Sequence, residues 1–456
     1  MKQYRYQELI EYTRMRKIPK GFEESYEQYK PDDTSYLMTH FFFEEMLAPY
    51  GLDEKQHTYL SEALFAVEED ERLLYFSKFF VWDMCSARNK YDVDNYSELV
   101  PDCIGKYNEA YCFLVLLACA EKARPEMERR GIPESCYKDI PHRMLREQMK
   151  RYKETGEIDV LDMPWKLNFY TLSIFLFDRF LFIPYVHGDR FTMYRSRVNG
   201  KVVGLYDGDC KFDTEGQLID ETLPEDDQEK YKGDKATGWN NPYIRKKDRK
   251  YAFITDFEDH KESVTGYYMN PLGFTENRKV TLGKKEYERV LDKDDWLLAF
   301  HIPEGEGYTP SRVKKSMELA LEFYDKYYPE LSIKGFWSES WLYDSRLSLL
   351  LTSDKNIVKV QRQFFNYTGG WDGEASYYYL FGGIQSRLDE AECKSSLQKK
   401  VKEYLQKGNF FYSTGMIFLR EEVDKITEYE GLTNVPYITE KDYDAFLKML
   451  ARNGTR

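Results

Sequence analysis

The fold of this chain is decided by residues 296–337, which read WLLAFHIPEGEGYTPSRVKKSMELALEFYDKYYPELSIKGFW. Residues 296–302 form a short apolar run typical of a buried strand, and residues 310–327 read as a helix. A second apolar run at 333–337 predicts another strand. Two strands joined through a helix make a β-α-β unit, so we expect this strand pair to be parallel.

The ordered pattern continues toward the C-terminus. We expect a second helix over residues 341–351 and a strand over 357–365. Residues 395–406 then read as a helix, and 410–419 as a last strand. This part of the chain is therefore expected to form a mixed sheet flanked by helices.

A β-hairpin is the clearest feature upstream of the β-α-β unit. Asn199-Gly200 separates two runs rich in aromatic and β-branched residues, 191–198 and 201–206. Asn-Gly between such runs is the strongest short-range signal for a hairpin. Residues 207–250 contain several glycines and an acidic segment, so we expect a long irregular excursion there.

The first part of the chain has helical periodicity instead. Leu145, Met149 and Tyr152 recur on one helix face, and Gly156 is placed to stop that helix. Residues 111–120 are apolar all round, as expected of a helix buried among others. The N-terminal part is therefore expected to be α-helical.

These patterns predict two domains. We expect a helical N-terminal domain over residues 1–178 and a second domain over residues 179–456, of α+β or α/β class. A chain of 456 residues is long enough for two large units, because domains usually contain ~150 residues.

The composition of the chain argues against several classes of binding partner and cellular compartment. The net charge of −13 argues against general binding to nucleic acid or to anionic lipid. Seven cysteines without a C-x-x-C pair suggest neither a disulfide framework nor a zinc site. The longest apolar run is far shorter than the ~20 residues of a membrane helix, and no targeting segment is visible. We expect a cytoplasmic protein that acts on small molecules; its oligomeric state stays open.

The turn at residues 303–310 is a candidate anion site. It joins a strand to a helix start, where backbone N–H groups are free, and Gly305 and Gly307 permit close approach of a phosphate. Glu304 and Glu306 bring negative charge to the same place, partly offset by Arg312. A glycine-bearing turn is also common as a purely structural feature, so that alternative stays open.

Short motifs run through both parts of the chain. They are Leu298-Ala-Phe-His-Ile-Pro-Glu-Gly305, Tyr328-Pro329, Ser338-Glu-Ser-Trp-Leu-Tyr-Asp344, Gly131-Ile-Pro133 and Asp178-Arg-Phe-Leu-Phe182. Together they resemble a bacterial acyltransferase-like family with a helical N-terminal domain and a GNAT-like C-terminal domain, over roughly residues 110–420. Ser338 stands where that family is expected to have a cysteine, which puts a thiol role at this position in doubt.

The resemblance implies a position for an acyl-CoA donor. In the GNAT layout, acyl-CoA lies in the split between two parallel strands, here 296–302 and 333–337. Its pantetheine pairs with one strand, and its pyrophosphate rests on the N-terminus of the following helix. The implied donor-binding residues are Ile302, Gly305, Gly307, Thr309, Ser311 and Arg312. Pro303 and Glu304 stand where a GNAT turn usually has Arg or Gln, which leaves room for another carrier thioester or a degenerate site.

Direct acyl transfer to an amine or hydroxyl acceptor needs a base and an acid. His301, which ends its strand, is a candidate base, and Glu339 is its rival. Tyr343 is a candidate acid because a tyrosine often has this role in the fold that the sequence resembles. His301 and Tyr343 have structural readings as well, as a core histidine and as one of 39 tyrosines.

A second hypothesis comes from a different class of protein. The acidic residues at the turn are compatible with a non-catalytic ligand-binding or assembly protein that keeps the fold. An open split between the two strands would favour the enzyme, and a split filled by aromatic side chains would favour the second reading. No metal site is expected, because His40 and Glu44 read as an exposed helix pair.

Overall fold

The computed structural model describes residues 3–19, 21–32, 34–86, 99–158, 160, 162–219, 252–372, 374–381, 388–409, 411–428 and 436–452. The chain divides into two compact units, Met1–Phe175 and Leu176–Arg456. The sequence predicted a boundary after residue 178. Within the described ranges, no helix combines the length and the apolar content needed to cross a bilayer.

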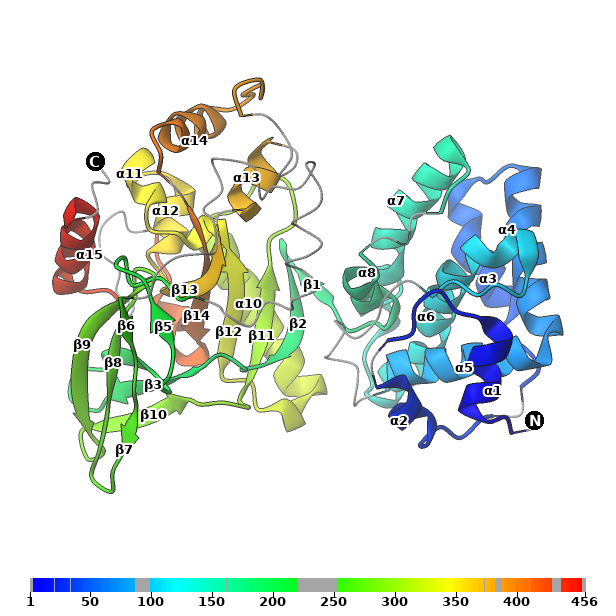
Figure 1. The fold of residues 1–456 in the computed structure, drawn as a ribbon, viewed down its shortest axis with the longest axis horizontal. Coiled ribbons are helices and arrows are strands. Elements are labelled where there is room, and N and C mark those ends of the chain that lie inside the picture. Colours follow the sequence, from blue (N-terminus) through cyan, green and yellow to red (C-terminus); the bar gives the residue numbers. More distant parts are fainter. Residues whose placement is uncertain are drawn as a thin grey trace. The chain divides into compact units, whose positions relative to one another are not determined.

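The first unit is helical, as predicted (Figure 1). Its helices are α1 (Tyr6–Thr13), α2 (Phe22–Tyr26), α3 (His40–Leu47), η1 (Ala48–Tyr50), α4 (Glu54–Glu69), α5 (Glu71–Cys85), η3 (Gly105–Ala110), α6 (Tyr111–Arg129), η4 (Glu134–Cys136), α7 (Ile140–Thr155) and α8 (Met163–Tyr170). Helix α7 ends where the sequence predicted, at Gly156, whose φ of 77° is left-handed and suits glycine.

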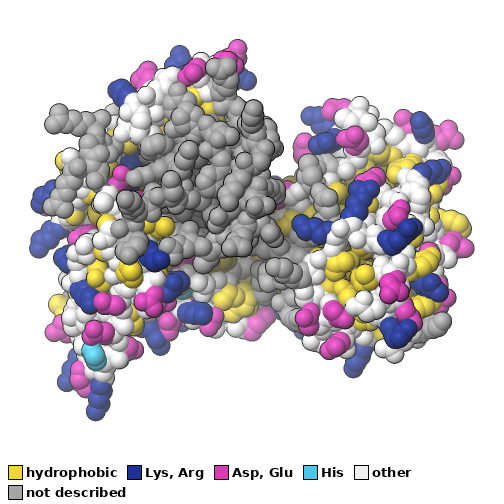
Figure 2. All heavy atoms as spheres, viewed as in Figure 1, with side chains coloured by type: hydrophobic (Ala, Val, Ile, Leu, Met, Phe, Trp, Pro, Cys, Tyr) yellow, Lys and Arg dark blue, Asp and Glu magenta, His cyan; other side chains and the backbone are white. Residues whose placement is uncertain are grey.

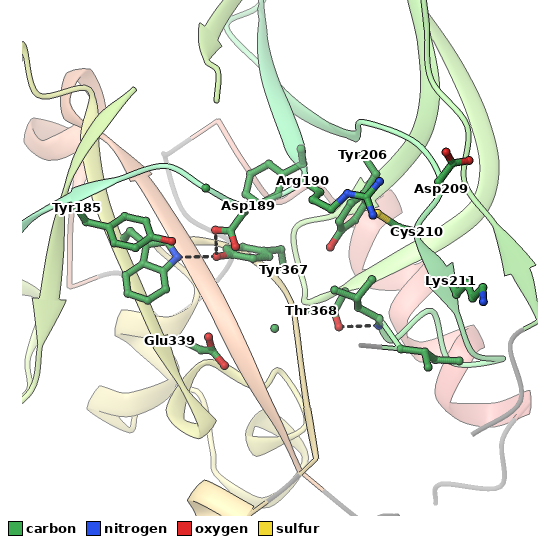
Figure 3. Close-up of a pocket in the computed structure, with 16 residues that line it drawn as sticks. Tyr185, Asp189, Arg190, Tyr206, Asp209, Cys210, Lys211, Glu339, Tyr367 and Thr368 are labelled. Carbon is green, nitrogen blue, oxygen red and sulfur yellow. Dashed lines mark hydrogen bonds between the residues drawn. The ribbon is translucent and has the colours of Figure 1, made fainter. Parts of the chain in front are cut away.

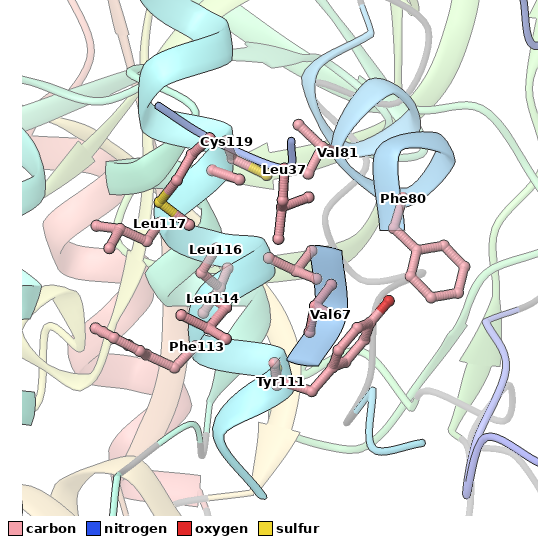
Figure 4. Close-up of a cluster of buried hydrophobic side chains, with 14 of the residues drawn as sticks. Leu37, Val67, Phe80, Val81, Tyr111, Phe113, Leu114, Leu116, Leu117 and Cys119 are labelled. Atoms are coloured by element: carbon pink, nitrogen blue, oxygen red, sulfur yellow. The ribbon is translucent and has the colours of Figure 1, made fainter. Parts of the chain in front are cut away.

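Helix α6 is the centre of the helical core. All ten residues from 111 to 120 are buried, which confirms the prediction of a helix that is apolar on every side. Helix α5 packs beside it. Figure 4 shows side chains of this core, among them Leu114 and Leu116 of α6 and Val67 of α4. The helical unit therefore has a hydrophobic core of its own.

The second unit contains two main sheets (Figure 1). The first, sheet A, has the order β1-β2-β11-β12-β14-β13. Its strands are β1 (Phe175–Phe177), β2 (Phe180–Val186), β11 (Trp296–His301), β12 (Gly335–Ser340), β13 (Phe365–Asp372) and β14 (Tyr412–Leu419). Strands β11 and β12 are parallel, which confirms the predicted β-α-β unit, and the neighbours β2 and β14 run antiparallel to them.

The second sheet, sheet B, grows from the predicted hairpin. Its order is β10-β3-β4-β8-β7, and β9 also pairs with β8. The strands are β3 (Phe191–Ser196), β4 (Val202–Tyr206), β7 (Glu258–Asp259), β8 (Ser263–Asn270), β9 (Phe274–Gly283) and β10 (Tyr287–Leu291). Gly200 in the hairpin turn has a φ of 74°, as Asn-Gly predicts. The short strands β5 (Lys211–Phe212) and β6 (Phe253–Ile254) form a separate pair, and the rest of the predicted excursion, 220–250, lies outside the described residues.

Helices cover sheet A. They are α10 (Pro310–Tyr327), η6 (Pro329–Leu331), η7 (Trp341–Tyr343), α11 (Leu347–Leu350), α12 (Asn356–Gln361), α13 (Glu374–Phe381), α14 (Ser396–Gln406) and η8 (Arg420–Lys425). Helix α15 (Glu440–Arg452) packs on sheet B instead, where the Tyr268 hydroxyl donates to Asp442 at 2.6 Å. Helix α10 has the predicted bounds and packs against β2, where the Tyr324 hydroxyl donates to the carbonyl of Phe182 at 3.4 Å. On the face shown in Figure 2, Lys and Arg side chains are interspersed with Asp and Glu side chains over the described surface.

Two predictions for the segment after β12 need correction. The strand expected over 357–365 is wrong, because residues Asn356–Gln361 form helix α12 and the strand begins only at Phe365. A short apolar run does not distinguish a strand from a buried helix. Here Val358 and Gln361, three residues apart, are buried, and α12 packs on α10. The single helix expected over 341–351 is two short pieces, η7 and α11.

Candidate active site

Strands β11 and β12 separate at their C-terminal ends. They pair in parallel from Leu297 with Gly335 to Ala299 with Trp337, and no later pair joins them in this described region. Each strand continues beside its other neighbour: His301 pairs with β2, and Ser340 pairs with β14. Backbone N–H and C=O groups along the two inner edges therefore lack ladder partners, and an extended ligand that carries amides can bind there.

The register places both base candidates on one face of sheet A. Ala299 and Trp337 are paired, so side chains two residues farther along, His301 and Glu339, project to the same side. Gly415 lies opposite Glu339 on β14, and Tyr367 lies opposite Gly415 on β13. This face thus carries Glu339 and Tyr367 next to the point where β11 and β12 separate.

A cavity of about 440 Å³ lies at this face (Figure 3). It is lined by Tyr185, Gly188, Asp189, Arg190, Phe191, Tyr206, Asp209, Cys210, Lys211, Leu218, Ile219, Trp337, Glu339, Tyr367, Thr368 and Gly369. Sheet A supplies aromatic side chains and Glu339, whereas the connection after β2 and the segment after β4 supply most of the remaining wall. The walls of the cavity are thus formed by chain segments that are distant in sequence.

Glu339 has the electrostatics of a general base. Burial raises the pKa of its carboxyl to about 7; a hydrogen bond with Ser413 lowers it, and the nearby Asp189 raises it. A carboxylate with a pKa near neutrality exists in both protonation states at physiological pH, so it can accept a proton and release it again. A side chain on Gly369 would collide with this carboxylate, because a Cβ there would lie 2.8 Å from Glu339 Oε1.

Two successive hydrogen bonds fix the carboxylate of Asp189, which also lines the cavity. The indole Nε1 of Trp337 donates to the hydroxyl of Tyr367 at 2.7 Å, and that hydroxyl donates to Oδ2 of Asp189 at 2.6 Å (Figure 3). The ring of Tyr185 stacks on Trp337, with centroids 4.2 Å apart. Burial raises the pKa of Asp189. Asp189 and Glu339 therefore face one cavity with aromatic walls.

Tyr367 can occupy this position only because residue 415 is glycine. A Cβ at Gly415 would lie 2.2 Å from Cζ of Tyr367, so the change Gly415→Ala must push the ring away. We expect this variant to lose about 1 to 3 kcal/mol of unfolding free energy, the usual effect of overpacking, measured by urea denaturation. Gly283→Ala is the matched control, because a Cβ at that strand position meets nothing within 4 Å. Equal stability of the two variants would contradict the close fit.

Tyr343, the predicted acid, is fully buried in η7, directly after β12. The hydroxyl groups of Ser338 and Tyr308 lie close to the Tyr343 hydroxyl, and both lower its pKa. The hydroxyls of Tyr308 and Tyr343 are buried, and neither has a hydrogen-bond partner of good geometry among the described residues. Burial raises the pKa of both tyrosines. A buried hydroxyl without such a partner is available to a ligand atom.

His301 is placed differently from Glu339. Burial lowers the pKa of its imidazole to about 4, which keeps the ring neutral at physiological pH and makes it a weak base. It is not among the residues that line the cavity. Only one of the two base candidates therefore faces the cavity.

The glycine turn after β11 is held by an arginine that sequence reasoning did not single out. Gly305 and Gly307 have φ values of 118° and 96°, a conformation that favours glycine. The guanidinium of Arg179 donates to the carbonyls of Pro303, Gly305 and Glu306, the last at 2.8 Å. The turn carbonyls therefore point toward Arg179.

The start of helix α10 already binds an acidic side chain. Thr309 is the N-cap, and its hydroxyl accepts from the N–H of Arg312 at 3.3 Å. The N–H of Ser311 donates to Oε1 of Glu428 at 3.0 Å. Nε of Arg312 donates to Asp178 at 2.7 Å, so this arginine is paired. A carboxylate thus lies where the implied pyrophosphate would rest.

The structure brings some predicted residues together and not others. Glu339 lies at the cavity, His301 and Tyr343 lie near the strand separation, and the six implied donor-binding residues lie along one turn and helix start. Sequence reasoning missed Asp189, Tyr367 and Glu428. The only local signal was Gly188 beside Asp189, which is weak. Among the described residues, no group of three or more His, Cys, Asp or Glu is placed to hold a metal.

Two families match most of the chain between them. Residues 42–172 match the family described as N-acyltransferase N-terminal domain, and residues 232–417 match the family described as GNAT-like C-terminal domain. No curated protein matches the chain.

Several solved structures are similar to the chain over most of its length. They are an acyltransferase in complex with decanoyl-CoA (16% identity, TM-score 0.52), an acyltransferase mutant in complex with octanoyl-CoA (15%, 0.51), and an acyltransferase in complex with decanoyl-CoA and teicoplanin (16%, 0.50). Each comparison covers 87% of this chain and 93% of the other. At these identities the likeness shows a shared fold.

Proposed function

This chain belongs to an acyltransferase-like family with a helical N-terminal part and a GNAT-like C-terminal part, and from that premise we propose that it transfers an acyl group from acyl-CoA to an amine. The observation that carries the proposal is the separation of β11 and β12 beside a cavity that contains Glu339. The family description names N-acyl transfer, and similar structures hold octanoyl-CoA or decanoyl-CoA.

We place the donor between the separating strands. Its pantetheine amides would pair with backbone groups on the inner edge of β11 beyond Ala299, near Ile302. Its pyrophosphate would rest on the turn and the start of α10, at Gly305, Gly307, Thr309, Ser311 and Arg312.

Glu339 is the proposed base, ahead of His301, because it lines the cavity and its pKa is about 7. The acceptor enters as an ammonium and gives one proton to the Glu339 carboxylate. The neutral nitrogen then attacks the thioester carbonyl carbon, and the C–S bond breaks as the C–N bond is completed. The new amide nitrogen loses its second proton to solvent.

Tyr343 is the proposed acid for the leaving thiolate. Its hydroxyl is buried beside Tyr308 and Ser338, near the end of the strand separation. Transfer of the tyrosine proton to sulfur releases CoA as a thiol, and solvent restores the proton. Tyr308 is placed to steady the Tyr343 oxygen meanwhile, because its own hydroxyl is buried beside it.

The proposal is tested by donor binding and by CoA release. CoA and acyl-CoA should raise the melting temperature in a saturable way, because a ligand of the folded state stabilises it. CoA thiol should then appear when an amine is added to acyl-CoA and enzyme. Binding without thiol release with any amine or alcohol would support the non-catalytic alternative, and no binding would overturn the donor site.

Removal of the Glu428 carboxylate from the start of α10 should strengthen donor binding. In Glu428→Gln we expect the Kd for CoA to fall about 3- to 10-fold, because an anion at a helix start is worth roughly 1 kcal/mol and Glu428 competes for that place. Isothermal titration gives the Kd. Pantetheine, which lacks the pyrophosphate, should bind both proteins equally. An equal gain for pantetheine would show that Glu428 acts elsewhere than at the pyrophosphate.

A further inference from the structure

We propose that Asp189 binds the acceptor as an ammonium ion, so that the acceptor is a basic aliphatic amine. This inference rests on the proposed function, because it names the group that holds the acceptor while Glu339 takes its proton. It is carried by the hydrogen bonds of Asp189, by the cavity that Asp189 and Glu339 share, and by a buried hydroxyl on the cavity wall.

Asp189 is a firmly held carboxylate with one oxygen left for a ligand. Its Oδ2 accepts the hydrogen bond from Tyr367, whereas Oδ1 accepts none of good geometry from the described residues. The backbone just before Asp189 is fixed as well. The N–H of His187 donates to the carbonyl of Asp295 at 2.8 Å, and the carbonyl of His187 accepts the N–H of Asp294 at 3.0 Å. The carboxylate is therefore preorganised for a donor in the cavity.

The two carboxylates of the cavity lack a strong cationic partner. In the described part of the chain, no lysine or arginine forms an ion pair with Asp189 or Glu339. The charge that acts on the pKa of Glu339 is that of Asp189, and the charge that acts on the pKa of Asp189 is that of His187. Arg190 and Lys211 also line the cavity but are not among these groups. Two carboxylates between aromatic walls cost free energy, which a bound ammonium offsets.

His187 is the competing source of positive charge. Its Nε2 bonds to the carbonyl of Phe191 at 3.0 Å, so this nitrogen carries a hydrogen, because a carbonyl can only accept. Nδ1 has no hydrogen-bond partner in the described part of the chain, and it lies 3.9 Å from Asp189 Oδ2, too far for a hydrogen bond. An ammonium that contacts Oδ1 directly is the stronger partner for this carboxylate.

A buried hydroxyl on the cavity wall offers a further acceptor. Tyr206 lines the cavity and is 2% exposed, and its hydroxyl has no hydrogen-bond partner of good geometry among the described residues. It points toward the middle of the cavity (Figure 3), and the charge of Asp189 contributes to its raised pKa. A primary ammonium has three N–H donors, and Asp189, Glu339 and Tyr206 can each accept one. The rings of Tyr185 and Trp337 on the same cavity also suit a cation.

Binding of matched probes tests the ammonium site without catalysis. Butylamine and butan-1-ol have the same length, but only the amine is charged at pH 7, and thermal-shift titration at constant ionic strength gives the Kd of each. We expect the Kd of butylamine to be about 10- to 100-fold lower, the effect of a hydrogen bond between charged groups. In Asp189→Asn, which keeps an acceptor for Tyr367, this preference should fall about 10-fold or more. Equal affinity of the wild type for both probes, or no binding of butylamine, would overturn the proposal.

Asp209→Asn is the matched control, because it removes the same charge from the same cavity. Asp209 has a left-handed φ of 54°, a conformation that asparagine adopts readily. This variant should keep the preference for butylamine, and an equal loss would mean that the overall charge of the cavity, not Asp189, attracts the cation. If Asp189→Asn does not fold, Tyr206→Phe takes its place. The Kd of butylamine should then rise about 3- to 10-fold, and an unchanged Kd would overturn the site.

The outcomes separate this proposal from the acyltransferase function. In CoA release from octanoyl-CoA, Asp189→Asn should raise the KM for butylamine about 10- to 100-fold, with a smaller effect on kcat. Activity with an unchanged KM would overturn the ammonium site while leaving acyl transfer intact. Binding of butylamine that depends on Asp189, without release of CoA, would support the site and contradict the catalytic function.

Discussion

In the change Glu339→Gln, kcat/KM for acyl transfer is expected to fall about 100- to 10,000-fold, the range that a positioned general base contributes. Glutamine keeps the shape of the side chain and can still contact Ser413, but it cannot accept the ammonium proton. The measurement is CoA release at saturating donor, with the melting temperature as a check of folding. Glu318→Gln, an exposed change on helix α10, is the matched control. Retention of more than a tenth of the activity would exclude Glu339 as the base and return His301 to that role.

The pH dependence of kcat/KM tests independently whether Glu339 is the base. Because burial raises the pKa of Glu339 to about 7, the base is ionised above that pH, so kcat/KM should rise with pH through about 7 and then level off. The negative charge of Asp189 contributes to the raised pKa. In Asp189→Asn the rising limb should therefore shift to lower pH. A limb that stays in place, or one near pH 4, would contradict the assignment and favour His301.

The second large effect concerns stability. In Arg346→Met we expect the free energy of unfolding to fall by about 3 to 5 kcal/mol, because the buried Asp344 and the part-buried Glu215 lose this cation. The Arg346 side chain is 5% exposed; it lies 3.2 Å from Asp344 Oδ1, and Nη2 donates to Glu215 at 2.9 Å. Asp344 also accepts the backbone N–H of Tyr412 at 2.7 Å, so the network anchors the start of β14.

Urea denaturation measures this loss, with Arg420→Met as the matched control. Arg420 makes a surface pair with Asp325, and such pairs contribute about 0 to 1 kcal/mol. Similar losses of unfolding free energy in the two variants would mean that the buried network contributes no more than a surface ion pair. If Arg346→Met does not fold, Arg346→Lys still tests the network. Lysine keeps the charge without the fork of donors, so an intermediate loss is expected.

Elements set by local sequence were predictable. Helix α10 has the expected bounds because Thr309 caps it, and the hairpin turns at Gly200 because Asn-Gly dictates that turn. The error at Asn356–Gln361 arose because β-branched residues read as a strand, whereas the segment is a helix that packs on α10, with Val358 and Gln361 buried. The domain boundary and the roles of His301, Glu339 and Tyr343 remain predictions.

The cavity could not be predicted because its parts meet only through strand register. Glu339 was a candidate by its place after a strand, but nothing in the sequence placed Asp189 and Tyr367 beside it. Tyr367 reaches Asp189 because it pairs with Gly415, a contact set by the antiparallel register of β13 and β14. The donor chemistry came from the family resemblance, because the glycine turn by itself is a weak signal.

The order of strands in sheet A has a consequence for synthesis of the protein. Strand β14 follows the other five strands of sheet A in the chain, yet it lies between β12 and β13. Until residue 419 leaves the ribosome, both of those strands keep an open edge, and open edges favour misassembly. The helical core, with its shorter-range contacts, can form early in translation, whereas Gly415 and hence the cavity wall arrive near the end. Any truncation before β14 would leave two exposed edges and an incomplete cavity.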